Sequence, residues 1–196
     1  MTTLTRSQVQ ERNRETVLRV ARESFLRDGY TATSLASVAR DAGFTTGIVY
    51  SSFGSKADLA LAVLGDLQAE QIASLGARLA GGGSSDDLLE RVRIWARDAT
   101  DSGWVRFELE LLLDSIGDAR LSTAQTQRQA TAVAEVAAVV RSLVPAREVD
   151  DSTVEVLAEA AVDYAIGVGI RQVVNREASP DRFLALVAPM VRLLGS

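Results

Sequence analysis

The segment from Thr45 to Phe53 is rich in side chains that can form hydrogen bonds, and it directly follows the short turn at residues 41–45. Its polar groups are hydroxyls, which can donate to or accept from a phosphate or another polar partner. The local pattern leaves six of its residues facing outward or sideways: Thr45, Thr46, Gly47, Tyr50, Ser51 and Ser52.

Two short helices are expected to position this segment. Apolar residues recur at helical spacing over residues 35–42, and Ser34 is suited to the N-cap. Thr45 can cap the next helix, which Val49 and Phe53 anchor to the interior through their i, i+4 spacing. The spacing predicts a helix-turn-helix, although a generic helical corner fits it equally well.

The whole chain reads as helical, with few turn signals and no sustained strand alternation. We predict an all-α fold with a three-helix N-terminal domain (residues 1–56) and a larger helical domain (residues 57–196). Asp28 and Gly29 are expected to end the first helix. About nine helices are expected, near residues 8–27, 35–42, 46–53, 56–80, 86–100, 104–116, 121–144, 152–176 and 180–194.

Composition argues against several kinds of chemistry. The 196 residues include no His and no Cys, so the commonest general base, the thiolate nucleophile and zinc–sulfur sites are absent. We therefore expect no enzyme, no metal site and no cofactor. The net charge is −5, but residues 1–60 hold eight basic and six acidic side chains. A mildly basic N-terminal segment on an acidic remainder is compatible with nucleic-acid binding.

The N-terminus lacks the apolar core of a secretory signal, and no apolar run reaches the ~20 residues of a membrane span. The expected location is the cytoplasm, with no membrane partner.

Two runs carry a resemblance to a known family. FLRDGYTATS (residues 25–34) and VARDAGFTTGIVYSSFGSKADL (residues 38–59) closely resemble the signature of the tetracycline-repressor (TetR) family, and the likeness covers about residues 10–65. Beyond this segment, the chain resembles the family only in size and helical make-up. The resemblance implies an N-terminal helix-turn-helix DNA-binding domain and a C-terminal helical domain for ligand binding and dimerisation.

The resemblance also implies roles for individual positions. Thr33 and Ser34 would meet phosphate at the start of the second helix. The recognition helix would enter the major groove at Thr45, Thr46 and Gly47, while Tyr50 and Lys56 would contact phosphates. The predicted DNA-binding residues are Thr33, Ser34, Thr45, Thr46, Gly47, Ile48, Tyr50, Ser51, Ser52 and Lys56.

The recognition segment departs from the family in two ways. Ser52 stands where the family often has His or Tyr. No Arg, Lys, Asn or Gln lies between Thr45 and Phe53, so bidentate readout of guanine or adenine from this helix is not available. We expect Thr46 and Ile48 to contact thymine methyl groups, but a simply buried Ile48 fits equally well. The arginines at positions 6, 12 and 14 are either DNA contacts or ordinary solvated charges.

In the family, the body binds an inducer and dimerises through its last two helices. Aromatic residues with a few polar groups suit an apolar or aromatic ligand, although each one can equally be ordinary core. Glu108 and Glu110 hint at a cationic or hydrogen-bonding ligand, but exposed surface acids are the simpler interpretation. The predicted ligand-binding residues are Trp95, Trp104, Phe107, Glu108, Leu111 and Tyr164. The predicted dimer residues are Ala161, Ala165, Val168, Phe183, Val187 and Val191; a monomer core is the alternative for these faces.

The resemblance therefore predicts a repressor that binds a palindromic operator as a homodimer and is released by a small organic inducer. A ligand would shift the population towards a state in which the fourth helix moves. The alternatives are a helical ligand-binding or scaffold protein without DNA binding, an activator, and a helical enzyme built on carboxylates.

Overall fold

The computed structural model describes residues 5–81, 83–143, 150–175, 177–179, 181, 184–185 and 188, and it is all-helical over these residues. This confirms the predicted all-α fold. Most of the predicted ninth helix, including Pro189, lies outside the described residues. Eight helices are described: α1 (Arg6–Ala32), α2 (Leu35–Asp41), α3 (Thr46–Phe53), α4 (Lys56–Leu79), α5 (Ser85–Asp101), α6 (Trp104–Asp114), α7 (Ala119–Leu143) and α8 (Asp151–Val174).

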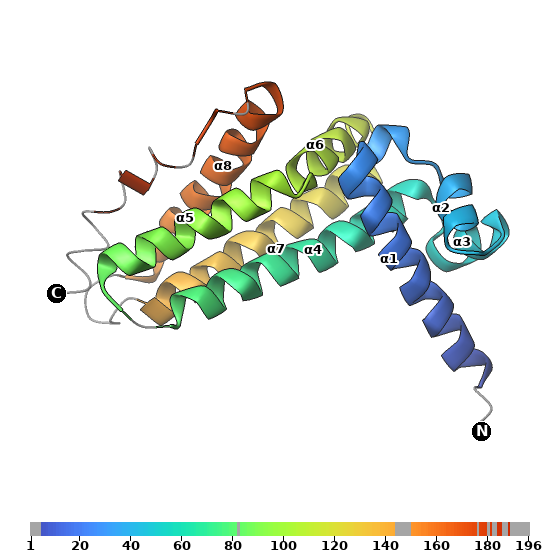
Figure 1. The fold of residues 1–196 in the computed structure, drawn as a ribbon, viewed down its shortest axis with the longest axis horizontal. Coiled ribbons are helices and arrows are strands. Elements are labelled where there is room, and N and C mark those ends of the chain that lie inside the picture. Colours follow the sequence, from blue (N-terminus) through green and yellow to red (C-terminus); the bar gives the residue numbers. More distant parts are fainter. Residues whose placement is uncertain are drawn as a thin grey trace.

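Helices α1–α3 stand at one end of the molecule and are called the head; helices α4–α8 form an elongated body (Figure 1). Within the body, α4 packs against both α5 and α7, while α6 and α7 each pack against α8. The N-terminal half of α1 projects away from the body (Figure 1). Helix α6 is the part of the body that packs most extensively against α1.

Serine side chains cap the starts of α2 and α4, and the sequence analysis predicted the first of these caps. Ser34 caps α2 by accepting a hydrogen bond from the backbone N–H of Ser37, and Ser55 caps α4 by accepting one from Asp58. Both caps satisfy a backbone donor that has no partner inside its helix. Thr45 occupies the N-cap position of α3 as predicted, but its hydroxyl makes no capping hydrogen bond.

Helix α1 is longer than the sequence predicted. Gly29 interrupts it with φ 86° and ψ 171°, so the regular helix does end at the predicted glycine. The chain bends at this glycine and then resumes helical geometry for a further turn, which ends before Thr33. A Cβ at Gly29 would lie within 2.7–3.0 Å of the Glu110 and Arg106 side chains. This position therefore needs glycine both for its φ and for the approach of α6.

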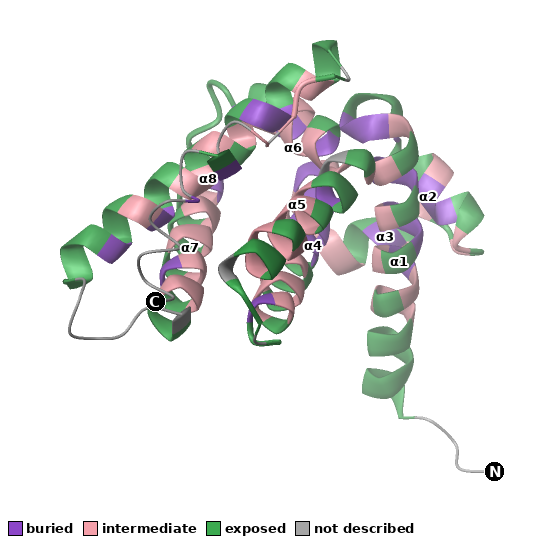
Figure 2. Cartoon of the chain, turned by 60° about the vertical axis from the view of Figure 1, so that its left-hand side comes forward, coloured by how far each residue is buried: buried purple, intermediate pink, exposed green. Residues whose placement is uncertain are grey.

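A single buried cluster joins the head to the body. Figure 2 shows buried residues on α1, α4 and α6. The Phe25 and Phe107 rings stack with centroids 4.6 Å apart and 9° between their planes, and both side chains are fully buried. Leu59 and Leu64 of α4 belong to the same cluster. This core runs continuously across residue 56, so the predicted boundary between two domains at that residue stays a prediction.

The start of α6 lies directly against the backbone of α1. Gly103, the N-cap of α6, has φ 86°, and a Cβ there would collide with the carbonyl oxygen of Leu26. The start of α6 is also close to α8, since a Cβ at Gly169 of α8 would collide with the side chain of Val105. Two glycines therefore allow α6 to pack closely against α1 on one side and α8 on the other.

We expect Gly103→Ala to lower the melting temperature by at least about 4 °C more than Gly117→Ala. Both glycines have positive φ, so both substitutions carry the ~1–2 kcal/mol strain of a left-handed L-residue. Only position 103 adds a collision, since nothing lies within 4 Å of a Cβ at position 117. Thermal unfolding followed by circular dichroism measures both variants; equal melting temperatures would contradict the close packing of α6 on α1.

Candidate nucleic-acid interface and effector cavity

Helices α2 and α3 form the helix-turn-helix that the sequence predicted. The turn is fastened by a hydrogen bond of 2.8 Å from the N–H of Phe44 to the carbonyl of Ala39. Val49 is fully buried and Ala39 is 1% exposed, while Phe53 packs against the same core. These contacts hold α3 by one face and leave its other face to solvent.

The exposed face of α3 is neutral and polar. Tyr50 is 54% exposed, and Thr45, Gly47 and Ser51 are also exposed. The hydroxyl of Thr45 makes no capping bond, and the first N–H groups of a helix have no partner within the helix. The N-terminal end of α3 therefore presents donors that suit a phosphate oxygen or a base acceptor.

Other predicted contact residues on α3 are partly engaged. The hydroxyls of Ser51 and Ser52 both donate to the carbonyl of Ile48, at 2.9 and 2.8 Å. In this arrangement they can accept a hydrogen bond but have no proton left to give. Thr46 and Ile48 are half-buried. The exposure of Ile48 therefore leaves both the thymine contact and the structural role open.

Thr33 and Ser34 precede α2 and act first as structural groups. Thr33 is 4% exposed, and its hydroxyl donates to the carbonyl of Gly29 at 2.8 Å. Ser34 is exposed but uses its hydroxyl to cap α2. A contact with phosphate at this point would rely mainly on backbone N–H groups and on the Ser34 oxygen.

Lys56, the only lysine of the chain, is half-buried at the start of α4. Its Nζ lies 4.2 Å from the centroid of the Tyr30 ring and donates to the carbonyl of Thr31 at 3.4 Å. Burial lowers the pKa of Lys56, and the carboxylates of Asp114 and Glu110 partly offset this effect. The ammonium is therefore held at the junction of head and body.

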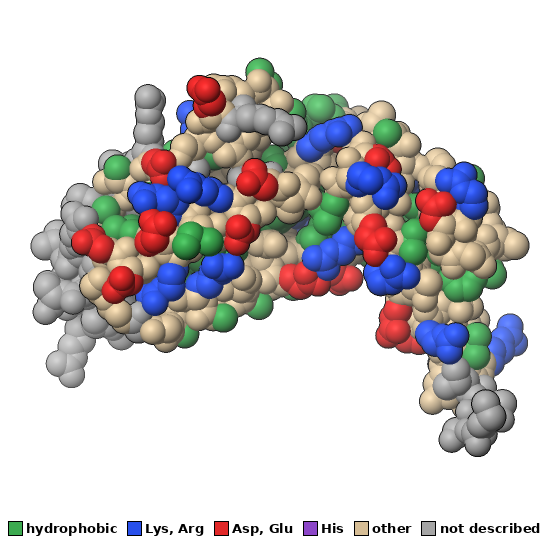
Figure 3. Space-filling view, viewed as in Figure 1, with side chains coloured by type: hydrophobic (Ala, Val, Ile, Leu, Met, Phe, Trp, Pro, Cys, Tyr) green, Lys and Arg blue, Asp and Glu red, His purple; other side chains and the backbone are tan. Residues whose placement is uncertain are grey.

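Sequence reasoning gave no definite role to Arg14. Its NH1 donates to the carbonyl of Ser52 at 3.0 Å, and its guanidinium lies 4.3 Å from the centroid of the Phe53 ring. Arg14 therefore holds the C-terminal end of α3, whereas Arg6 and Arg12 are exposed. Basic and acidic side chains alternate over the face of the molecule seen in Figure 3.

A polar contact between α6 and the end of α1 was also missed. Glu110 accepts a hydrogen bond from the N–H of Thr31 at 2.7 Å, and Arg106 donates to the carbonyl of Asp28 at 2.8 Å. Burial alone would raise the pKa of Glu110, but the hydrogen bonds from Thr31 and Arg106 bring it below its ordinary value. The predicted role of Glu110 as an exposed surface acid is therefore wrong.

The second link of this head–body contact is a tyrosine–carboxylate pair. Tyr30 donates its hydroxyl proton to Asp114 at 2.7 Å. Burial and this hydrogen bond both raise the pKa of Tyr30. The partners lie about 80 residues apart in sequence, and no local pattern relates them.

The body encloses a cavity of about 260 Å³ between α4, α5, α6, α7 and α8. Four of the six predicted ligand-binding residues line it: Trp95, Trp104, Glu108 and Tyr164. The other two, Phe107 and Leu111, lie in the core on the opposite side of α6. Residues 104 and 108 lie one turn apart on the face of α6 towards the cavity, whereas residues 107 and 111 lie on the face that packs into the core shared with α1 and α4.

A buried polar cluster forms part of the cavity wall. Glu108 is paired with Arg128, whose guanidinium also donates to Gln68 at 2.8 Å and to Gln125 at 3.0 Å. The side chains of Arg128 and Glu108 are 11% and 20% exposed. The interpretation of Glu108 as an exposed acid is therefore also wrong, because its partner comes from α7.

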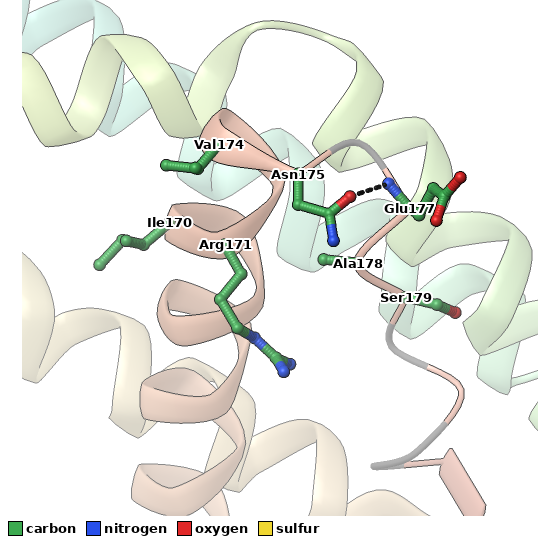
Figure 4. A pocket seen from close by; sticks show the side chains of 7 residues that line it. All are labelled: Ile170, Arg171, Val174, Asn175, Glu177, Ala178 and Ser179. Carbon is green, nitrogen blue, oxygen red and sulfur yellow. Dashed lines mark hydrogen bonds between the residues drawn. The ribbon is translucent and has the colours of Figure 1, made fainter.

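A second pocket, of about 550 Å³, lies at the C-terminal end of α8 (Figure 4). Its lining comes only from α8 and the segment that follows, and the carbonyl oxygen of the Asn175 side chain accepts a hydrogen bond from the N–H of Glu177. Residues 176 and 180 lie outside the described residues. Because five helices line the cavity in the body, whereas one helix and the segment after it line this second pocket, the cavity in the body is the better enclosed site for a small molecule.

The predicted dimer residues of α8 do not form its most exposed face. Ala161, Ala165 and Val168 line the cavity, and Val168 is only 3% exposed. The opposite side of α8 carries an exposed stripe of apolar and small residues that is interrupted by Asp163. This stripe, the outer face of α8, comprises Val156, Ala160, Gly167 and Val174. Phe183, Val187 and Val191 lie outside the described residues.

The described part of the chain offers neither a metal-binding cluster nor a membrane-spanning helix. No group of three or more acidic, His or Cys residues is arranged to hold a metal ion there. None of the helices in that part is long and apolar enough to cross a membrane.

Comparison with known proteins agrees with this geometry. Residues 17–63 match the sequence model of the family described as "Bacterial regulatory proteins, tetR family". Helices α2 and α3, which form the helix-turn-helix, lie within the matched segment. The chain is therefore similar in sequence to this family over the segment that holds its helix-turn-helix. Among curated proteins, none matches the chain by sequence.

Solved structures share the fold over nearly the whole chain. A TetR-family transcriptional regulator from Pectobacterium atrosepticum is 23% identical, covering 97% of this chain and 95% of its own, with a TM-score of 0.64. GusR of Salmonella enterica is 21% identical over 99% of both chains, with a TM-score of 0.65. The reduced form of E. coli NemR is 18% identical, covering 94% of this chain and 97% of its own, with a TM-score of 0.63. At these identities, the likeness shows the fold alone.

If Lys56 contacts a phosphate, Lys56→Gln should weaken DNA binding several-fold and reduce the slope of log K against log salt by about 1. A lysine that neutralises a phosphate releases about one counterion from the DNA on binding, and the Gln variant would not release it. Fluorescence anisotropy with a fixed duplex over a salt series measures the slope. The matched control is Arg78→Gln, at the far end of α4, where the cation pairs with Asp98. An unchanged slope for Lys56→Gln would exclude the phosphate contact.

Proposed function

We propose that this protein is a ligand-responsive transcriptional repressor, which binds a palindromic operator as a homodimer and is released by a small organic molecule. One observation carries the proposal: α6 lines an enclosed cavity with one face and contacts the end of α1 with the other. A binding site for a small molecule is thus one helix away from the helix-turn-helix. The expected location is the cytoplasm, where such an operator is accessible.

The proposed DNA contact is made by the N-terminal end and exposed face of α3. Thr45, Thr46 and Gly47 would enter the major groove first, and the exposed Tyr50 hydroxyl would reach a phosphate. Because α3 carries no Arg, Lys, Asn or Gln, base recognition would depend on close approach, hydroxyl acceptors and methyl contacts from Ile48. Ser34 and Lys56 would add phosphate contacts on either side.

The outer face of α8 is the proposed dimer surface. Val156 is 65% exposed and Val174 is 89% exposed, an unfavourable arrangement for an isolated helix in water. Ala160 and Gly167 between them would allow a partner helix to approach closely. A two-fold dimer would place its recognition helices about 34–36 Å apart, as a palindromic operator requires.

Release would follow from a movement of α6. A ligand in the cavity contacts Trp104 and Glu108, whereas Arg106 and Glu110 on the same helix hold the end of α1. Any ligand that favours another position of α6 would disturb the segment immediately before α2. The effect on DNA affinity is limited by the differential affinity of the ligand for the two positions.

The direct test is an electrophoretic shift with DNA from upstream of the gene that encodes this protein. We expect specific, salt-sensitive binding by the wild type and at least tenfold weaker binding by Tyr50→Ala, because the exposed phenol contributes little to the core. The matched control is Tyr164→Phe, on the cavity wall. Equal affinity of Tyr50→Ala and wild type would remove Tyr50 from the interface.

Operators with single thymine substitutions extend this test to Ile48. If Ile48 contacts a thymine methyl, Ile48→Ala should lose the preference for thymine at one position in each half-site. A folded dimer that binds no sequence selected from random DNA would instead favour the alternative, a helical ligand-binding or scaffold protein without DNA binding.

Ala160→Arg should convert a dimer into a monomer, since it places a charge in the middle of the outer face of α8. Sedimentation equilibrium measures the mass of each species. Ala77→Arg, on an exposed position of α4, is the control and should remain dimeric. A dimer that survives Ala160→Arg would place the interface elsewhere.

A further inference from the structure

The chemistry of the cavity wall restricts the molecules that it can accept. Among the described residues that line it, Glu108 and Arg128 are the only carboxylate and the only guanidinium. They pair with each other, so the wall as a whole is neutral. A charged ligand would either remain unpaired or have to break this pair, and both are costly at such low exposure.

Three of the five N–H donors of the Arg128 guanidinium are already engaged. Its Nε and both terminal nitrogens already donate, to Gln125, Gln68 and Glu108 respectively. Gln68 also donates its amide to the backbone carbonyl of residue 128 at 3.4 Å. Because the charge of Arg128 is matched by that of Glu108, the cluster favours neither an anion nor a cation.

Among the described residues that line the cavity, one side-chain donor is both buried and without a partner. The indole Nε1 of Trp104 is buried and makes no hydrogen bond among the described residues. Trp95 lines the same cavity, but its Nε1 donates to the carbonyl of Gln71 at 3.1 Å. A buried N–H without a partner costs free energy that an acceptor would recover.

The remaining wall is mostly aliphatic and aromatic, with residues such as Ile72, Leu109 and Val136. A volume of about 260 Å³ lies below the ~300–1,000 Å³ of pockets for drug-sized ligands, so the occupant is small.

We infer that the effector is a small, uncharged, largely apolar molecule with one hydrogen-bond acceptor, such as an aryl ketone, and that the acceptor receives the Trp104 indole N–H. This inference rests on the proposed function for the role of the cavity as an effector site. The ligand class itself does not depend on DNA binding.

The test is isothermal titration calorimetry on the full chain without DNA, using matched aromatic probes. Acetophenone and 2-acetonaphthone supply the acceptor, α-methylstyrene is isosteric with acetophenone but lacks it, and benzoate and benzylammonium carry charge. We expect one ketone to bind roughly tenfold more tightly than α-methylstyrene and than either ion. If neither ketone exceeds the alkene, or if an ion binds best, the inference is overturned.

Two indole variants separate the hydrogen bond from packing. Trp104→Phe should abolish the preference for the ketone over α-methylstyrene while keeping an aromatic ring. Trp95→Phe removes an indole N–H that is already satisfied within the protein, so the preference should remain. Loss of selectivity in both variants, or in neither, contradicts the assigned role of Trp104.

A third variant tests the neutral wall. Glu108→Gln leaves the Arg128 charge without its carboxylate, so benzoate should gain at least tenfold in affinity while acetophenone changes little. No gain for benzoate would contradict the argument from the closed ion pair.

An electrophoretic shift with the tightest-binding ketone then distinguishes the two proposals. Ketone binding without release of operator DNA leaves the ligand class intact and removes the proposed ligand response. Operator binding by a protein that prefers no ketone overturns the ligand class alone.

Discussion

The packing of α6 against the end of α1 is the constraint on which the other parts of the structure depend. Gly103 allows the two backbones to touch, and the Phe25–Phe107 stack fills the space beside them. Glu110 then accepts from the Thr31 N–H, a few residues before α2 begins. Because α2 and α3 continue directly from this segment, the position of the helix-turn-helix is set by a helix of the body.

This packing explains why head and body share one core. A self-contained N-terminal domain would bury its own apolar faces and meet the rest of the chain through a polar surface. Here Phe25 has its main aromatic contact on α6, and Leu59 and Leu64 of α4 lie in the same cluster. A displacement of α6 or α4 therefore changes the packing inside the head, since close-packed interiors transmit strain.

The sequence was most informative where signals are local. Ser34 caps α2 as predicted, Gly29 ends the regular part of α1, and Val49 is buried as its helical spacing predicts. The wrong predictions concern residues whose partners lie on other helices. Glu108 and Glu110 look like surface acids in an apolar helix, yet one pairs with Arg128 of α7 and the other with the α1 backbone. Only the helix packing reveals such partners.

The two faces of α6 also differ in the kind of interaction that they hold. Towards α1 the contacts are directional: two backbone groups and one phenol are paired with charged side chains at 2.7–2.8 Å. Towards the cavity the described wall is largely apolar, with one buried donor that lacks a partner and a neutral ion pair. Directional bonds fix α6 in one register, whereas an apolar wall tolerates sliding. Under the proposed function, a helix held firmly on one face and loosely on the other would suit two discrete positions, because a ligand would shift the loose face until the directional bonds break together.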